Sequence, residues 1–304
     1  MSDKKHTHTH QLQQASRETR HEWYGKTITL ASVVGIIILV VAIIYFIGQR
    51  GLAAFTTDHV KVTDFLFSAD WNPLDGKQYV GAAAMIVTSF LVMILATLLA
   101  VPFALALGIF MTEFAKNRLT KYLQIMIELL AGIPSVVYGF LGVTIIVPAI
   151  RTVFGGAGFG ILAGILVLFV MVLPTITSLT IDALKGVPAQ YRQASLALGA
   201  TWWQTTSKVI LRVATPGILT AIIFGMARAF GEALAVQMVI GNAVLMPHNL
   251  ISPAATLTSQ LTSQLGNTVN GTLANNALWS LALFLLLMSL AFNLVVRIIG
   301  KRKG

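Results

Sequence analysis

Two opposite charges stand within one apolar stretch of the chain. Arg228 and Glu232 lie inside residues 213–241, a run long enough to cross a bilayer as a helix, and their spacing places them one helical turn apart. A charge at that depth costs at least about 2.5 kcal/mol on insertion scales. Either the two charges form an ion pair that only holds helices together, or they form a polar site on a pathway through the membrane. We favour the pathway, because pairing lowers the cost without explaining why either charge is present.

The composition is that of an integral membrane protein. Hydrophobic residues make up 56% of the 304 residues, charged residues make up 11%, and the mean hydropathy is +0.80. A soluble domain carries about 25% charged residues. The chain has no cysteine, which excludes disulfides, thiolate metal sites and cysteine nucleophiles.

The net charge of +10 does not indicate nucleic acid, because the basic residues follow the membrane pattern. Most of the 21 lysines and arginines fall in four segments: 1–26, 112–124, 182–212 and 297–304. The positive-inside rule therefore predicts that both termini are cytoplasmic.

The hydropathy pattern predicts an all-α integral membrane protein with six transmembrane helices. The expected spans are residues 27–49, 78–112, 128–150, 159–181, 213–241 and 273–296. The expected divisions are a disordered cytoplasmic tail at 1–26, an anchor helix at 27–49, a transmembrane domain at 78–299 with a cytoplasmic loop at 182–212, and a basic cytoplasmic tail at 300–304. Alternating histidines in the first tail could chelate a metal weakly, but nothing nearby fixes a geometry, and we expect no metal site.

Prolines and hydroxyls interrupt the third and fourth expected spans. Ser135 follows Pro134, and Thr175 follows Pro174. Irregular membrane helices are tolerated where they line a cavity or pack tightly, and these alternatives stay open here. Ser135 and Thr175 are further candidates for a pathway; the alternative is a hydroxyl that bonds back to its own helix. Glu128, at the start of the third span, is expected to be a solvated or loop-capping carboxylate.

The cytoplasmic loop predicts two short helices. Pro188 suits the first turn of one and Gly199 suits its end, while Thr201 and Gln204 fit a capping box for the next. One face of the first helix is expected to hold Tyr191, Ala194, Ser195 and Leu198. That face could press onto another protein or lie on the lipid surface.

The segments 50–79 and 242–273 are expected outside the cell. Trp71 and Tyr79 suit aromatic anchors at the membrane interface, and residues 254–265 could form a short helix.

Three stretches make the chain resemble the permease of bacterial phosphate ABC importers, of the PstC type. They are Glu128-Leu-Leu-Ala-Gly-Ile-Pro-Ser-Val-Val-Tyr-Gly139, the loop around Gln193-Ala-Ser-Leu-Ala-Leu-Gly199, and Ala227-Arg-Ala-Phe-Gly-Glu-Ala-Leu-Ala-Val236. The similarity runs from about residue 60 to the C-terminus. The run after the Gly-Glu pair favours PstC over its sister permease.

The resemblance implies a type I ABC importer core, with a MetI-like permease fold, built from spans two to six. The 186–200 helix would then be the coupling helix that docks on the ATPase, through Tyr191, Gln193, Ala194, Ser195, Leu198 and Gly199. The family's Glu-Ala-Ala signature reads Gln193-Ala194-Ser195 here, and Arg212 stands where a proline is expected. The change from glutamate to Gln193 removes any salt bridge through that position. It leaves the shape of the small protruding surface that the 186–200 helix forms, which we call the knob.

The resemblance also implies partners in a bacterial cell membrane. They are a second permease of the PstA type, an ATPase homodimer of the PstB type and an external phosphate-binding protein of the PstS type. The chain lacks a Gly-x-x-x-x-Gly-Lys-Ser/Thr loop, so we expect ATP and Mg²⁺ on the separate ATPase, and neither a cofactor nor catalytic residues in this chain. Arg228 would attract or gate phosphate, and Glu232 would hold Arg228 when phosphate is absent.

Three other functions are alternatives for a chain of this composition. A permease for another oxyanion, such as sulfate or phosphonate, differs only in selectivity. A membrane-embedded hydrolase would need a nucleophile–base pair or a metal cluster in the spans, and none of the six histidines falls clearly there. A stand-alone ion channel fits the composition but would not need an ATPase.

Overall fold

The computed structural model describes residues 17–73, 79–115 and 117–301. Contacts divide the chain into two units, Met1–Gln49 and Arg50–Gly304. Six helices of the described residues are long and apolar enough to cross a membrane: Glu22–Thr56, Ala83–Phe114, Ser135–Phe154, Ile161–Lys185, Trp202–Phe230 and Leu273–Val295. The predicted all-α architecture with six spans is therefore confirmed.

The first unit holds most of α2 (Arg17–Thr56), a single long helix. Residues 17–26 continue this helix, whereas the sequence placed them in a disordered tail. The rest of that tail, with its alternating histidines, lies outside the described residues, as do the last three residues of the predicted basic tail.

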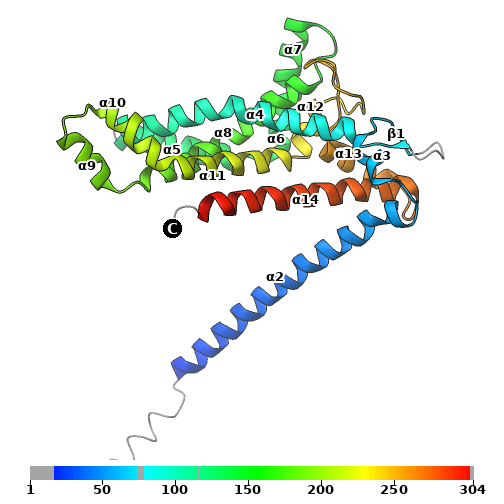
Figure 1. Cartoon of the computed structure of the whole chain (residues 1–304), viewed down its shortest axis with the longest axis horizontal. Helices are drawn as coiled ribbons and strands as arrows, with labels where there is room; N and C mark the ends of the chain where they lie inside the picture. The colour runs from blue at the N-terminus through cyan, green and yellow to red at the C-terminus, as the bar shows by residue number, and fades with distance from the viewer. Residues whose placement is uncertain (1–16, 74–78, 116, 302–304) are drawn as a thin grey trace, which may run out of the picture. The chain divides into compact units, whose positions relative to one another are not determined.

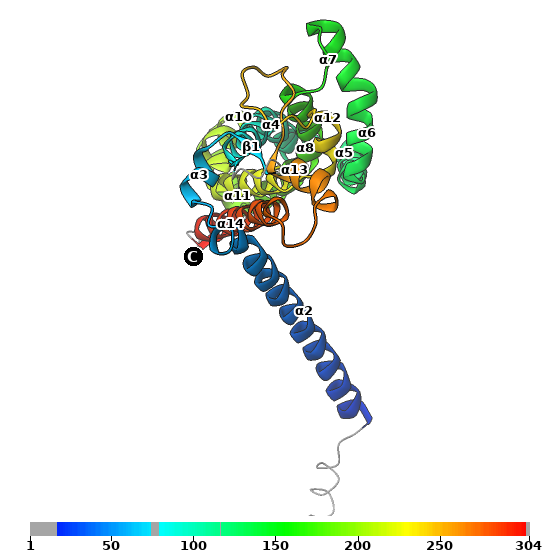
Figure 2. The same cartoon turned by 90° about the vertical axis from the view of Figure 1, so that its right-hand side faces the viewer.

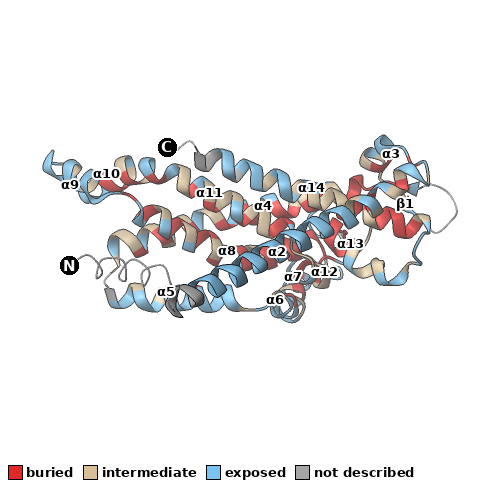
Figure 3. Cartoon of the chain, turned by 90° about the horizontal axis from the view of Figure 1, so that it is seen from below, coloured by how far each residue is buried: buried red, intermediate tan, exposed pale blue. Residues whose placement is uncertain are grey.

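Three long helices form the centre of the second unit. They are α4 (Ala83–Ile109), α8 (Ile161–Lys185) and α11 (Leu211–Phe230), and they run side by side (Figures 1 and 2). The last helix, α14 (Leu273–Lys301), packs against α11. Figure 3 shows buried residues concentrated on α4 and α8. Their largest fully buried side chains include Met85, Met93, Leu168, Met171 and Ile176.

The third predicted span begins later than expected, because the chain breaks before it. Helix α5 (Asn117–Gly132) ends ahead of Pro134, which has no backbone N–H and disfavours helical geometry in the residue before it. The span itself consists of α6 (Ser135–Leu141), the π-helical turn η2 (Gly142–Ile146) and α7 (Val147–Phe154). Glu128 therefore lies on α5, where it is exposed and accepts a hydrogen bond from Gln124 at 3.0 Å.

The fifth predicted span is also broken. Helix α10 (Trp202–Thr205) and the π-helical turn η3 (Thr206–Ile210) lead into α11, which ends at Phe230. A new short helix, α12 (Leu234–Val239), follows. The apolar run at 213–241 is thus two helices with a turn between them.

The two ends of the central bundle carry different structures (Figure 1). One end holds α9 (Ala189–Ala197), α10 and the C-terminal end of α14. The π-helical turn η1 (Phe110–Phe114) continues α4 toward the same end.

The other end holds α3 (Val62–Phe67), a small hairpin and α13. The hairpin pairs β1 (Trp71–Asn72) antiparallel with β2 (Tyr79–Val80). The short helix predicted at 254–265 is confirmed as α13 (Leu257–Gln264), which the 3₁₀ turn η4 (Leu265–Asn267) follows. The first half of α13 is buried among α4, α12 and α14.

Close packing of α11 on α8 depends on Gly225. A Cβ at this position would lie 2.5 and 2.7 Å from the Cγ1 and Cδ1 atoms of Ile176, a fully buried residue. We expect Gly225→Val to destabilise the protein by roughly 1–3 kcal/mol through overpacking, seen as a lower Tm in detergent. In Gly132→Val, the matched change on α5, the added atom meets nothing within 4 Å. Equal losses of Tm in the two variants would contradict this packing argument.

Candidate functional site: Arg228, the helix break and the α9 knob

Arg228 is held by α8. It lies in the last turn of α11, is partly exposed, and its Nη1 atom donates a hydrogen bond to Oγ1 of Thr175. The next hydroxyl on α8, that of Thr177, instead bonds back to the carbonyl of Leu173 at 2.7 Å. The structure therefore brings together two of the residues that the sequence singled out, and Thr175 turns its hydroxyl to the neighbouring helix.

Glu232 lies in the turn after α11, where its carboxylate caps the next helix. Its Oε1 accepts a hydrogen bond from the backbone N–H of Ala235 at 3.1 Å, near the start of α12. A negative charge is favourable at the N-terminus of a helix. The carbonyl oxygen of Glu232 accepts a hydrogen bond from Thr258 of α13 at 2.8 Å.

The predicted ion pair between Arg228 and Glu232 is wrong for this conformation. Within residues 17–73, 79–115 and 117–301 the structure has an ion pair between Arg192 and Glu113, and none between Arg228 and Glu232. The prediction assumed one continuous helix, in which residues four apart share a face. Because α11 ends at Phe230, Glu232 does not continue the face that carries Arg228.

A small cavity lies beside Glu232. Its volume of about 10 Å³ is close to the size of one water molecule, and its polar lining comes from Ser89, Glu232, Thr256 and Thr258. Arg228 does not line it. These hydroxyls were not among the predicted site residues; their signal was the Thr88-Ser89 pair in a mostly apolar span and the Ser/Thr-rich stretch at 256–259.

Ser135 is the first residue of α6 and is partly buried. No hydrogen bond joins it to Arg228 or Glu232 in the described part of the chain, so its role in a pathway stays a prediction. Helix α6 does reach the helix break, because a Cβ on Gly139 would lie 3.0 Å from the Cα of Ala235 on α12.

The predicted pair of short helices is confirmed in the loop at 182–212. Pro188 precedes α9, and Gly199 ends it with φ of 82°, a left-handed conformation that glycine adopts without strain. The N–H groups of Gly199 and Ala200 bond to the carbonyls of Leu196 and Ser195 at 3.0 and 3.3 Å, which is a Schellman ending. Thr201 and Gln204 form the predicted capping box of α10.

The outer face of α9 differs from the predicted one. The hydroxyl of Ser195 lies 2.9 Å from that of Thr205, so Ser195 faces its own chain and not a partner. Tyr191 and Leu198 are 47% and 89% exposed, and Ala194 is also exposed. Gln193, at the position of the family's glutamate, is exposed as well. The exposed surface of the knob therefore keeps its apolar tip, whereas Ser195 is not part of that surface.

A buried ion pair positions α9 against the end of α4. Arg192 donates from Nη2 to Oε1 of Glu113 at 2.6 Å, and the Glu113 side chain is only 1% exposed. The indole of Trp202 on α10 donates to the Glu113 carbonyl at 3.2 Å. This ion pair was not predicted from the sequence; its signal was Glu113, a carboxylate directly after an uncharged span. Nowhere in the described residues do three or more His, Cys, Asp or Glu side chains group as metal ligands.

We expect Arg192→Met to destabilise the protein by about 2–4 kcal/mol, because it leaves the Glu113 carboxylate buried without a partner. The measurement is thermal unfolding of the detergent-purified protein. The double variant Glu113→Gln with Arg192→Met should recover most of the lost Tm, since no buried charge remains. A double variant as unstable as the single one would contradict this explanation.

Known proteins similar to this chain show its family and fold. Residues 104–304 match the family described as binding-protein-dependent transport system inner membrane component. The chain is 47% identical over 292 residues to the probable ABC transporter permease protein YqgH of Bacillus subtilis (strain 168), covering 95% of this chain and 94% of that protein. It is 35% identical over 266 residues to the phosphate transport system permease protein PstC of Pasteurella multocida (strain Pm70), covering 79% and 81%.

Two solved structures share the fold. A chain of a bacterial alginate ABC transporter, in complex with an alginate pentasaccharide-bound periplasmic protein, aligns with a TM-score of 0.63 over 94% of this chain and 96% of its own, at 14% identity. A chain of the inward-facing MetNI methionine ABC transporter aligns with a TM-score of 0.54 over 71% and 94%, at 23% identity. Six spans, this fold and the family match together place the chain among the binding-protein-dependent transport system inner membrane components, as a permease of an ABC importer.

Proposed function

We propose that this chain is one of two permeases that pass inorganic phosphate through a bacterial cytoplasmic membrane, with both termini on the cytoplasmic side. Its similarity to relatives named as phosphate transport system permease proteins supports this substrate. The observation that carries the proposal is Arg228, a cation within a span that has a hydroxyl partner on α8 and no carboxylate bound to it among the described residues.

A guanidinium suits a travelling phosphate. Its donors form a planar fork that matches phosphate oxygens, and it keeps its charge at every physiological pH. In this conformation Arg228 uses Nη1 on Thr175, a neutral partner that an anion can displace. The partly exposed remainder of the group would face the second permease.

Glu232 would act from the other side of the helix break. It lines the small cavity beside α13, so widening that cavity would place a carboxylate on the route of the anion. Repulsion between like charges would then keep phosphate from binding too tightly.

We expect Glu232→Gln to lower both the KM and the maximal rate of phosphate uptake, because the amide oxygen still caps α12 but no charge repels the anion. Glu232→Ala also removes the helix cap and should lower the free energy of unfolding by about 1 kcal/mol more. Uptake kinetics and Tm separate the two effects. An unchanged KM in the glutamine variant would reject a role for the charge.

The proposed protein partners bind at the two ends of the bundle. A homodimeric ATPase carries ATP and Mg²⁺ and receives the tip of α9, while this chain binds no cofactor and catalyses no reaction. ATP binding draws the coupling helices of the two permeases together, and the Glu113–Arg192 anchor passes that movement to α4. An external binding protein delivers phosphate at the opposite end of the bundle.

The test is uptake of radiolabelled phosphate by the complete assembly in proteoliposomes, with sulfate and a phosphonate as competitors. Phosphate uptake that depends on ATP and resists both competitors supports the proposal. Preferential uptake of sulfate or phosphonate would assign the permease to that oxyanion instead. Uptake that persists without the ATPase would indicate a channel.

A further inference from the structure

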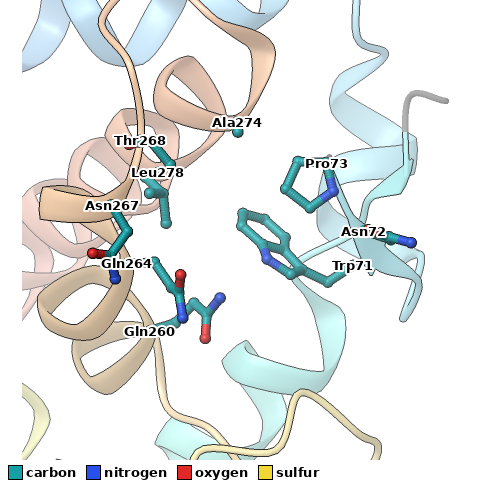
Figure 4. A pocket seen from close by; sticks show the side chains of 9 residues that line it. All are labelled: Trp71, Asn72, Pro73, Gln260, Gln264, Asn267, Thr268, Ala274 and Leu278. Carbon is teal, nitrogen blue, oxygen red and sulfur yellow. The ribbon is translucent and has the colours of Figure 1, made fainter. Parts of the chain in front are cut away.

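The groups that could bind an oxyanion lie around Arg228 and not in the cavity beside the hairpin. That cavity has a volume of about 320 Å³, and Trp71, Pro73, Gln260 and Gln264 are among the residues that line it (Figure 4). No Lys, Arg or His is among the described residues of its lining, so it offers an anion no positive charge. Further contacts to a passing anion must therefore come from side chains near Arg228.

Tyr138 bridges the break between α5 and α6. The carbonyl of Leu130 would normally accept from the N–H four residues later, but that residue is Pro134, which has none. The Leu130 carbonyl instead accepts a long bond from the N–H of Ile133 at 3.3 Å and a short one from the Tyr138 hydroxyl at 2.6 Å. The last carbonyls of a helix need such substitute donors. The proline therefore explains why the tyrosine is tied to the preceding helix.

The bond to Leu130 uses the only proton of the Tyr138 hydroxyl. A tyrosine has one O–H donor, and its oxygen can also accept. The donor goes to Leu130, and no described residue donates a hydrogen bond to the oxygen. Only 5% of the residue is exposed, so water has little access to it. Tyr138 therefore presents a hydrogen-bond acceptor to whatever lies beside it.

Tyr138 lies near Arg228. It belongs to the same cluster of buried side chains as Ala229 and Phe230, the two residues that follow Arg228 in α11. The charge of Arg228 is close enough to act on the tyrosine hydroxyl. Helix α6 also packs on α12 and touches α8, the helix that carries Thr175. The acceptor and the guanidinium are therefore parts of one polar region inside the bundle.

Several donors and one acceptor can discriminate between oxyanions. Arg228 offers N–H groups, and Thr175, which accepts from it, still has its own hydroxyl proton to donate. Phosphate and arsenate keep at least one proton at physiological pH, so each can accept from these donors and donate its O–H to Tyr138. Sulfate has no proton, and its negative oxygens would face the tyrosine oxygen. A site that hydrogen-bonds a substrate O–H rejects analogues without it.

We propose that Tyr138 is a specificity-determining residue, whose oxygen accepts a hydrogen bond from a protonated oxyanion bound at Arg228. The inference deepens the proposed function and rests on it in taking Arg228 as the anion site. Because Leu130 holds the hydroxyl proton, the tyrosine favours anions that can donate, such as phosphate and arsenate, over sulfate, which cannot. The selectivity then originates in the helix break that Pro134 makes.

The test measures oxyanion affinity of the permeases and ATPase assembled in nanodiscs, without the external binding protein, which would itself select the anion. The rise of Tm with added phosphate, arsenate or sulfate, at constant ionic strength, gives an apparent Kd for each. The wild type should bind phosphate and arsenate about tenfold or more tightly than sulfate. Tyr138→Phe should bring the ratio of the sulfate Kd to the phosphate Kd close to one, because it removes the acceptor. Tyr122→Phe, at an exposed tyrosine of α5, should keep the wild-type ratio.

The ratio of the two Kd values separates selectivity from folding. Tyr138→Phe also loses the hydrogen bond to Leu130, and so its Tm without any anion should fall. A purely structural loss would weaken binding of every oxyanion alike and leave the ratio unchanged. Differences in charge and hydration between the anions are the same for each variant, so they do not affect the comparison.

An unchanged ratio in Tyr138→Phe would overturn the inference and leave the proposed function intact. A ratio lost in Glu232→Gln but kept in Tyr138→Phe would also overturn it, since the carboxylate would then be the acceptor. Sulfate bound in preference to phosphate by the wild type, or phosphate affinity unchanged in Arg228→Gln, would overturn both proposals. Preference for a phosphonate, which can also carry a proton, with discrimination against sulfate lost in Tyr138→Phe, would reject phosphate as the substrate and sustain the role of Tyr138.

Discussion

Arg228→Gln is expected to abolish phosphate uptake while the complex stays assembled. Glutamine is shorter than arginine and loses both the charge and the fork, and a charge-assisted hydrogen bond contributes about 2–3 kcal/mol, or at least a 30-fold effect. Uptake of radiolabelled phosphate by the reconstituted assembly measures the loss, and co-purification of the ATPase establishes that assembly survives.

Two further variants separate charge from position. Arg228→Lys keeps the charge without the planar fork and should retain an intermediate rate. Arg151→Gln removes an exposed cation at the end of the third span and should transport normally. Wild-type uptake by Arg228→Gln would dismiss the assignment. An equal loss of phosphate uptake in Arg151→Gln would show that the effect of Arg228→Gln comes from net charge in general and not from its position.

Leu198→Asp is expected to uncouple the ATPase. Leu198 is 89% exposed at the tip of the α9 knob, and burying a leucine side chain in a partner contributes about 2 kcal/mol. Aspartate forfeits this and adds an unpaired charge to the interface. We expect affinity for the ATPase to fall about 100-fold or more, seen as lost co-purification or lost stimulation of ATP hydrolysis.

The control for this change lies at the other end of the bundle. Val269 is 73% exposed, so Val269→Asp introduces the same charge on a similarly exposed apolar residue away from α9. It should leave ATPase binding intact. Normal co-purification and normal stimulated hydrolysis in Leu198→Asp would show that the tip of α9 is not the docking surface.

Features that depend on short stretches of chain were predictable from the sequence. Hydropathy over about twenty residues decides whether a helix can cross a membrane, and six such helices are present. Local hydrogen bonding decides where a short helix ends, and so Pro188, Gly199 and the Thr201–Gln204 box marked α9 and α10 correctly.

The break after Phe230 was not predictable in the same way. Gly231 stands at the turn and caps α11, but no proline marks it and the apolar run continues beyond it, so hydropathy alone indicates one continuous helix. The consequence is large, because the expected pairing of Glu232 with Arg228 assumed a continuous helix. In the folded chain Glu232 caps α12, and Thr258 of α13 holds the turn.

The sequence by itself determined the membrane class, the number of spans and the presence of an arginine within a long apolar stretch, because each depends on the composition of a local stretch. Tertiary structure alone decided the hydrogen-bond and ion-pair partners: Thr175 for Arg228 and Glu113 for Arg192. These contacts join residues far apart in the chain. They depend on how each helix is rotated about its axis and packed on its neighbours, which no local pattern specifies.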